Sequence, residues 1–184
     1  MSGLSARPPA HRGLAALVLI GLVGLSGCGY GLVGRGGGLD PSIKRIGVPI
    51  FRDGTGRTSL DQKITQKVIE ELLKRGKVDI VQSLEGVDAV VDGEIVSYQV
   101  QPVGFSGGSD TTTASRYSIT LTAKVKYFKP GDPQPMWQND AFAFRDEYDL
   151  GSDPSSFFDR EDQGVDRLAQ AFARSLVSAM LEAF

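Results

Sequence analysis

The feature that most constrains the fold is a strict alternation of apolar and polar residues between positions 116 and 128. Every second residue there is aromatic or aliphatic: Tyr117, Ile119, Leu121, Ala123, Val125 and Tyr127. Successive side chains of a β-strand point to opposite faces of its sheet, so this pattern predicts a strand with one buried and one wetted face. Other parts of the chain must then cover the apolar face.

Further strands are expected on both sides of this one. We place them at residues 43–51, 78–81, 88–103 and about 136–148, the last returning antiparallel to 116–128 after a turn. Apolar residues of 88–103 occur on both faces, which a β-bulge near Gly93 or burial of both faces would explain. Residues 104–115 are rich in Gly, Ser and Thr, and we expect a mobile loop there.

Two amphipathic helices complete the pattern. The first begins at Ser59, which with Gln62 resembles a capping box, and it ends before Gly76. The second begins at Asp153-Pro154 and runs to the C-terminus. Its apolar face comprises Val165, Leu168, Phe172, Leu176 and Met180. The element order predicts an α+β fold, in which two helices pack on one face of a mostly antiparallel sheet of four or slightly more strands.

The N-terminal segment is typical of a secretory signal peptide. A positively charged start precedes an apolar stretch at 14–25, whose length of about 12 residues is too short for a bilayer span, which needs about 20. The stretch ends at Cys28, the only cysteine, in the sequence Leu-Ser-Gly-Cys, which resembles the lipobox of bacterial lipoproteins. We therefore expect a signal peptide at 1–27, a lipidated anchor and Gly-rich tether at 28–42, and one domain at 43–184.

Lipidation of Cys28 would set the location of the protein. One acyl chain binds a membrane only marginally, whereas several chains, such as palmitate, would hold the protein there. By resemblance to bacterial lipoproteins, Gly29 after the anchor indicates the outer membrane, with the domain on the periplasmic side.

The residue inventory excludes several classes of site. Without residues 1–27 the chain has 18 basic and 22 acidic residues, a balance that argues against a nucleic-acid-binding protein. Cleavage of the signal peptide would remove His11, the only histidine, and lipidation would modify the thiol of Cys28. Zinc sites of Cys and His, Ser-His-Asp triads, Cys-His dyads and structural disulfides are thereby excluded. We expect no enzymatic activity, no metal and no cofactor other than the covalent lipid on Cys28.

Three carboxylates remain as candidates for acid-base chemistry. Asp88, Asp92 and Glu94 lie in one strand-like run, where they are either a catalytic pair in a cleft or solvated acids on the face of a strand.

Four short motifs occur in order along the chain. They are Cys28-Gly29-Tyr30, the run IGVPIF at 46–51, the run DAVVDGEI at 88–95, and Met136-Trp137 leading to Glu147-Tyr148. Their order and spacing resemble the LPS-assembly lipoprotein family, LptE. The resemblance implies two helices on a four-stranded sheet. It also implies an outer-membrane protein that plugs the LptD β-barrel, assists the assembly of that barrel and serves lipopolysaccharide (LPS) transport.

A group of cations is a candidate site for LPS. Arg116, Lys124 and Lys126 share one parity of their strand, which places them on its polar face, and Arg145 comes near in the next strand. Because LPS carries phosphates, we interpret these four residues as candidate phosphate contacts. The alternative is solvated charge that protects a sheet edge. Trp137 is either a core residue or a platform for a ligand.

Two other functions stay open. A lipoprotein activator of a periplasmic cell-wall enzyme would share the anchor and an α+β domain, but the tether of about 12 residues reaches at most roughly 40 Å, which is short for crossing the periplasm. A periplasmic hydrolase is disfavoured by the missing His and Cys.

Overall fold

The structure is a computed structural model that describes residues 39–108, 111–150 and 157–182, all within one unit, Arg35–Phe184. The expected signal peptide at 1–27, the lipidation site Cys28, most of the tether and the Asp153-Pro154 cap lie outside the described residues.

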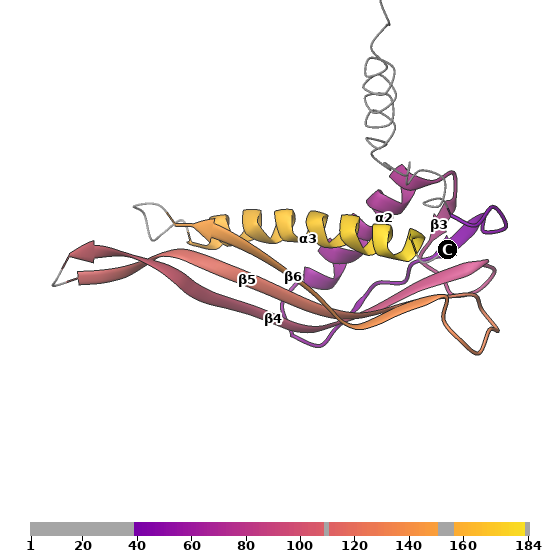
Figure 1. The fold of residues 1–184 in the computed structure, drawn as a ribbon, viewed down its shortest axis with the longest axis horizontal. Coiled ribbons are helices and arrows are strands. Elements are labelled where there is room, and N and C mark those ends of the chain that lie inside the picture. Colours follow the sequence, from indigo (N-terminus) through magenta and orange to yellow (C-terminus); the bar gives the residue numbers. More distant parts are fainter. Residues whose placement is uncertain (1–38, 109–110, 151–156, 183–184) are drawn as a thin grey trace, which may run out of the picture. The chain divides into compact units, whose positions relative to one another are not determined.

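A mixed sheet forms one layer of the fold (Figure 1). Its three long strands, β4 (Ala89–Gly108), β5 (Thr111–Phe128) and β6 (Trp137–Asp149), are antiparallel neighbours. Three short strands lie beyond β4. Of these, β1 (Arg45–Gly47) and β2 (Arg52–Asp53) pair parallel with β4, and β3 (Asp79–Val81) pairs parallel with β1.

The parallel pairs distinguish the sheet from the expected, mostly antiparallel one. The strand order is β3-β1-β4-β5-β6, with β2 beside β4. Helix α2 (Leu60–Arg75) connects the short strands to β3, and a helical crossover of this kind returns the chain parallel to the strand it left. The predicted α+β class is confirmed, and the sheet is mixed.

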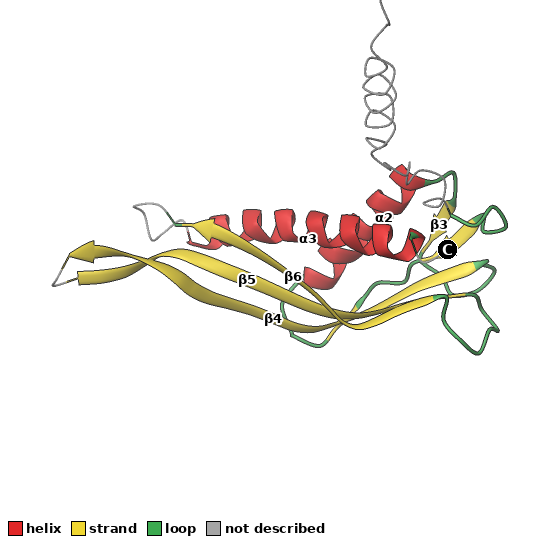
Figure 2. Ribbon diagram, in the orientation of Figure 1, coloured by secondary structure: helices red, strands yellow, loops and turns green. Residues whose placement is uncertain are grey.

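Both helices lie on the same face of the sheet (Figure 2). In α2 the four residues at the predicted spacing, Leu60, Ile64, Val68 and Leu72, are at most 2% exposed. In α3 (Phe157–Leu181) the five predicted core residues are at most 3% exposed. The helical period of the apolar residues therefore located the core of both helices correctly.

Aromatic residues fill the core between helix and sheet. Phe172 of α3 meets Phe142 and Phe144 of β6 edge to face, with ring centroids 5.3 and 5.9 Å apart. Trp137 packs against this core and meets Phe142 at 6.0 Å, which favours the core interpretation of this residue. Gly93 of β4 lies beneath Phe51, and a Cβ at this position would collide with the Phe51 ring.

The prediction of a loop at 104–115 was wrong. The described residues of this segment form the end of a hairpin, in which Phe105 pairs with Ala114 and Gly108 with Thr111. Its side chains are mostly exposed, so backbone hydrogen bonds rather than apolar burial organise these strands, and no alternation marks them. In β4 both explanations for the mixed pattern apply. Both faces are buried at 89–91, and the nearest register shift is at 95–97 rather than at Gly93.

The expected strand at 43–51 is interrupted and the predicted capping box is absent. Pro49 has no N–H to donate to a ladder, and pairing stops between β1 and β2. Ser59 has φ 63°, a left-handed conformation, and its side chain forms no capping hydrogen bond. A capping side chain requires an extended backbone at that position. Gly76 ends α2 as expected, in an extended conformation, and its N–H donates to the carbonyl oxygen of Leu72.

Candidate functional site

The candidate site is the polar face, which we define as the face of β4, β5 and β6 that points away from α2 and α3. The odd residues of β5 from Ile119 to Tyr127 are at most 1% exposed beneath the helices. The even residues, Arg116, Ser118, Thr120, Thr122, Lys124 and Lys126, therefore lie on the polar face. This confirms the parity predicted for the three cations of β5.

Lys124 and Lys126 lie beside acids. Lys126 is directly opposite Asp92 of β4, and Lys124 is opposite Glu94. Residues opposite each other in an antiparallel pair have Cβ atoms about 5 Å apart, so each ammonium group meets the field of a carboxylate. On the far side of β4, Arg52 of β2 contacts Asp92 at 2.8 Å and Glu94 at 4.0 Å.

These side chains surround a surface cavity of about 500 Å³. It is lined by three cations and three acids: Arg52, Lys124, Lys126, Asp92, Glu94 and Asp140. Positively and negatively charged side chains alternate from strand to strand across this cavity. Sequence reasoning found the two lysines but missed Arg52 and Asp140, because only the register of the sheet brings these strands together.

Arg116 and Arg145 are engaged elsewhere. Nε of Arg116 donates to Asp149 at 2.7 Å, and this ion pair raises the pKa of the guanidinium. Arg145 lies opposite Thr120 and contacts Glu147 at 3.0 Å. Arg116 is eight residues from Lys124 along β5, or about 26 Å. The four predicted contacts therefore do not converge on one point.

Two of the three carboxylates considered for catalysis, Asp88 and Asp92, are held by hydrogen bonds. Asp88 accepts hydrogen bonds from the backbone N–H groups of Lys44 and Arg45 at 2.8 and 2.9 Å, and these bonds lower its pKa. Asp92 accepts two hydrogen bonds from Arg52, at 2.8 and 3.1 Å. A general acid at neutral pH needs a raised pKa, and that of Asp88 is lowered, so Asp88 fits a structural role. The pairing of Asp92 with Arg52 favours the same interpretation.

A buried polar cluster at the start of α3 was missed from the sequence. The carboxylate of Glu161, which is 3% exposed, accepts a hydrogen bond from the hydroxyl of Tyr98 at 2.7 Å and contacts Arg57 at 2.9 Å. The Arg57 guanidinium also lies 4.5 Å from the centre of the Tyr98 ring. Glu161 precedes Val165 by four residues and therefore lies on the apolar face of α3. An acid on that face could have indicated a buried polar cluster from the sequence alone.

Among residues 39–182 that the structure describes, no helix is long and apolar enough to cross a membrane. That part of the chain also holds no cluster of three or more metal-ligating side chains.

The fold defines a class of α+β domains that several solved structures share. One is protein XCC0632 from Xanthomonas campestris, with TM-score 0.55 and 10% identity, covering 79% of this chain and 90% of that one. Another is a PelC dodecamer from Paraburkholderia phytofirmans that carries a point substitution, with TM-score 0.51 and 11% identity, covering 80% and 95%. A third is uncharacterized lipoprotein B from Nitrosomonas europaea, with TM-score 0.50 and 10% identity, covering 83% and 90%. At these identities the likeness shows the fold alone.

The sequence identifies the family within this class. Residues 43–180 match the model of LptE, the lipopolysaccharide-assembly family, and the chain belongs to that family. None of the curated proteins matches the sequence. The resemblance inferred from the four short motifs is confirmed. At the family level the protein is a membrane-associated lipoprotein of LPS assembly, and LptE is a family of lipoproteins rather than enzymes.

Proposed function

We propose that the protein is an outer-membrane lipoprotein, anchored by acyl chains on Cys28, that plugs an LptD-like β-barrel. In this role it assists the assembly of the barrel and the transport of LPS to the outer leaflet. Family membership supports the role in LPS assembly. The observation that supports plugging is the polar face described above.

The polar face matches the environment of a barrel lumen. The interior of a large outer-membrane barrel is polar, whereas its lipid-facing surface is apolar. Along β5 the polar face presents Thr, Lys and Arg, whereas Ser118 is only 5% exposed. Acids beside the lysines keep both signs of charge present. A surface of this kind can exchange its hydrogen bonds with water for bonds to a polar wall.

Purification from outer membranes tests this role. A tagged chain should co-purify with a large β-barrel, which mass spectrometry of the complex would identify as LptD-like. A photoreactive residue at Thr122 on the polar face should crosslink to that barrel. Recovery of a periplasmic cell-wall enzyme in place of a barrel would instead support the activator function.

Direct LPS binding is the finer part of the proposal. In the described part of the chain, Lys124 and Lys126 form no ion pair within 4.0 Å, whereas Arg116 and Arg145 each do. The two lysines are therefore the cations with the most freedom to contact a phosphate. We expect Lys124→Glu with Lys126→Glu to weaken LPS association and to make the remaining binding less sensitive to salt.

A second double variant tests whether LPS contacts the lysines or the arginines. Arg116→Gln with Arg145→Gln should weaken LPS association less, because each guanidinium already has a carboxylate partner. In the lysine variant each Glu would lie opposite Asp92 or Glu94, so we expect the free energy of unfolding to fall by about 1–2 kcal/mol, which leaves the domain folded. If the lysine variant binds LPS as the wild type does and still co-purifies with the barrel, the two lysines are not the LPS site. The proposal that the protein plugs the barrel would then stand without them.

A further inference from the structure

The described chain begins against the end of α2. Leu39 contacts Gly76, and a Cβ added to Gly76 would lie 2.7 Å from Cδ1 of Leu39. The next residue, Asp40, accepts hydrogen bonds from the N–H of Ser42 at 2.9 Å and from Nζ of Lys129 at 3.2 Å. The point at which the segment from Cys28 reaches the domain is therefore held in place by several contacts.

A surface cavity of about 510 Å³ surrounds this point, and we call it the entry surface. Its lining includes Leu39, the cations Lys44, Arg75 and Lys77, and the acids Asp40 and Asp79. Both acids already have partners, since Asp40 pairs with Lys129 and Asp79 lies 3.7 Å from Arg45.

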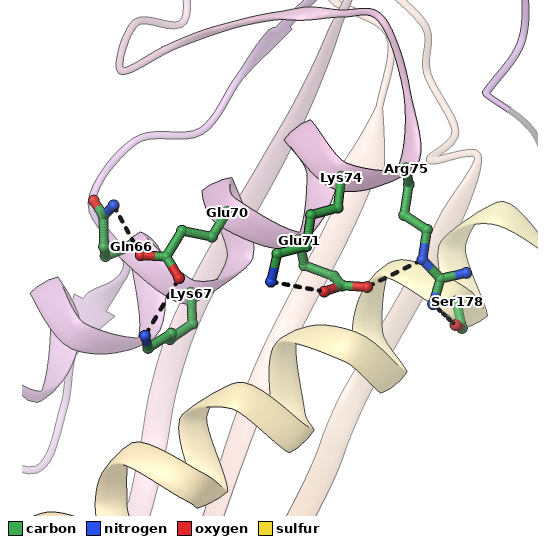
Figure 3. A network of polar contacts seen from close by, with 7 residues as sticks. All are labelled: Gln66, Lys67, Glu70, Glu71, Lys74, Arg75 and Ser178. Carbon is green, nitrogen blue, oxygen red and sulfur yellow. Dashed lines mark hydrogen bonds and ion pairs between the residues drawn. The ribbon is translucent and has the colours of Figure 1, made fainter.

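Arg75 is also held by neighbours. Figure 3 shows its guanidinium between Glu71 of α2 and Ser178 of α3, at 3.0 and 3.1 Å. Glu71 is 5% exposed and also contacts Lys74 at 3.7 Å. These bonds fix the last turn of α2, which carries one wall of the entry surface.

Two lysines of the entry surface are outside close ion pairs, and Lys44 interacts with Asp88 only through longer-range attraction, which helps to lower the pKa of Asp88. Lys44 and Lys77 are exposed, and in the described part of the chain neither forms an ion pair within 4.0 Å. Asp88, near Lys44, uses its carboxylate for the backbone N–H groups of Lys44 and Arg45. The side-chain charges of Lys44 and Lys77 are therefore available to an anionic partner.

We propose that the entry surface docks on the anionic phospholipid headgroups of the leaflet that holds the acyl chains of Cys28. The inference rests on the lipidation included in the proposed function and not on the barrel or on LPS. Leu39 follows Cys28 by 11 positions, so the entry surface stays within about 40 Å of the membrane. Lysine side chains match the charge of anionic lipid headgroups.

The strength of this contact follows from membrane electrostatics. Each lysine close to an anionic membrane surface strengthens binding about fivefold, and two strengthen it roughly 30-fold. The attraction acts only within about 8 Å at physiological salt. The anchor keeps the domain near the leaflet, which makes so short-ranged a contact effective.

Vesicle binding tests the proposal. The mature chain, residues 28–184, coupled through the Cys28 thiol to a maleimide lipid in vesicles keeps the tether and its length. Amide hydrogen exchange at residues 39–44 and 76–79 should be slower on equimolar phosphatidylcholine–phosphatidylglycerol vesicles than on pure phosphatidylcholine vesicles. Lys44→Gln with Lys77→Gln should remove most of this difference, because the contact should weaken about 30-fold. Equal exchange on the two kinds of vesicle, or an undiminished difference in the double lysine variant, would overturn the proposal.

A matched control separates the entry surface from overall charge. Arg160→Gln with Arg174→Gln removes two exposed cations from α3, and this variant should show the same difference in exchange as the parent chain. An equal loss in this control would also overturn the proposal. Because the vesicles contain neither LPS nor a barrel, a negative result here leaves the proposed function standing. Loss of barrel co-purification would leave the vesicle result standing.

Discussion

Glu161 carries a negative charge at a position where the rest of its helix face is apolar. Its carboxylate joins three parts of the chain: α3, β4 through Tyr98, and the segment before α2 through Arg57. A buried carboxylate is tolerated only when its oxygens have partners, and here both partners are in hydrogen-bond range. The same contacts hold the first turns of α3 against the sheet.

Removal of this carboxylate should destabilise the domain. Glu161→Ala leaves the Tyr98 hydroxyl and Arg57 without their partner, and we expect a loss of about 1–3 kcal/mol, because Arg57 stays partly in contact with water. Denaturant titration measures the change, with Gln163→Ala on the exposed face of α3 as the control. Equal stabilities for the two variants would show that the cluster contributes nothing.

Buried tyrosines should make the domain sensitive to alkali. Burial raises the pKa of Tyr127 and of Tyr148 from 10.0 to about 12, and burial together with Glu161 raises the pKa of Tyr98. The folded state therefore favours the neutral phenol. The corresponding stability is complete below pH 10 and is lost as pH rises from 10 towards 12.

The absorbance of tyrosinate measures this effect. In the folded protein these three phenols should ionise later than in the chain unfolded by denaturant, and the midpoint of denaturant unfolding should fall above pH 10. Ionisation of every tyrosine near pH 10 in a chain that stays folded would contradict the burial of these rings.

At the scale of elements, helix α3 and strand β6 form the centre of the core. Phe172 is fully buried, and its ring meets Phe142 and Phe144 in edge-to-face contacts. The β4–β5 hairpin, by contrast, reaches past the first turn of α3 (Figure 1) and leaves Phe105 63% exposed. The stability of the domain should therefore depend on the helix face far more than on the tip of the hairpin.

Phe172→Ala should lower the free energy of unfolding by about 3–5 kcal/mol, because lost transfer energy and the remaining cavity add together. Phe158→Ala is the matched control, since Phe158 is in the same helix but 75% exposed. The control should change stability by no more than about 0.5 kcal/mol. Thermal or denaturant unfolding measures both changes. Similar losses of unfolding free energy in the two variants would mean that this face of α3 is not the core.

At the scale of the whole molecule, anchor and domain have separate tasks. Every contact of the core described above lies between residues 39 and 182, whereas Cys28 precedes this part of the chain. Acylation and folding should therefore be separable by one substitution.

Cys28→Ser should abolish acylation, while the unfolding free energy of the domain stays within about 0.5 kcal/mol. Mass spectrometry of the mature N-terminus measures the first effect, and denaturant unfolding measures the second. A wild-type N-terminus without acyl chains would refute the expected anchor.

The sequence by itself determined the elements whose side chains follow a period. The alternation in β5 and the helical spacing in α2 and α3 located the buried residues, since burial of one face imposes its period on the sequence. The four short motifs identified the family. The alternation also predicted correctly which residues of β5 lie on the polar face. Where both faces are exposed, as at the end of the β4–β5 hairpin, no such period exists and the expectation of a loop was wrong.

Only the tertiary structure decided which charges meet. Asp92, Glu94 and Arg52 lie beside Lys124 and Lys126 because β2, β4 and β5 pair in one register, and that register depends on the bulge at 95–97. The partners of Arg116 and Glu161 likewise join residues distant in the chain, as does the position of Lys44 and Lys77 around one surface cavity at the end of α2. Local periodicity reports which face a side chain takes, but the neighbours on that face come from other strands and helices, whose placement depends on packing of the whole domain.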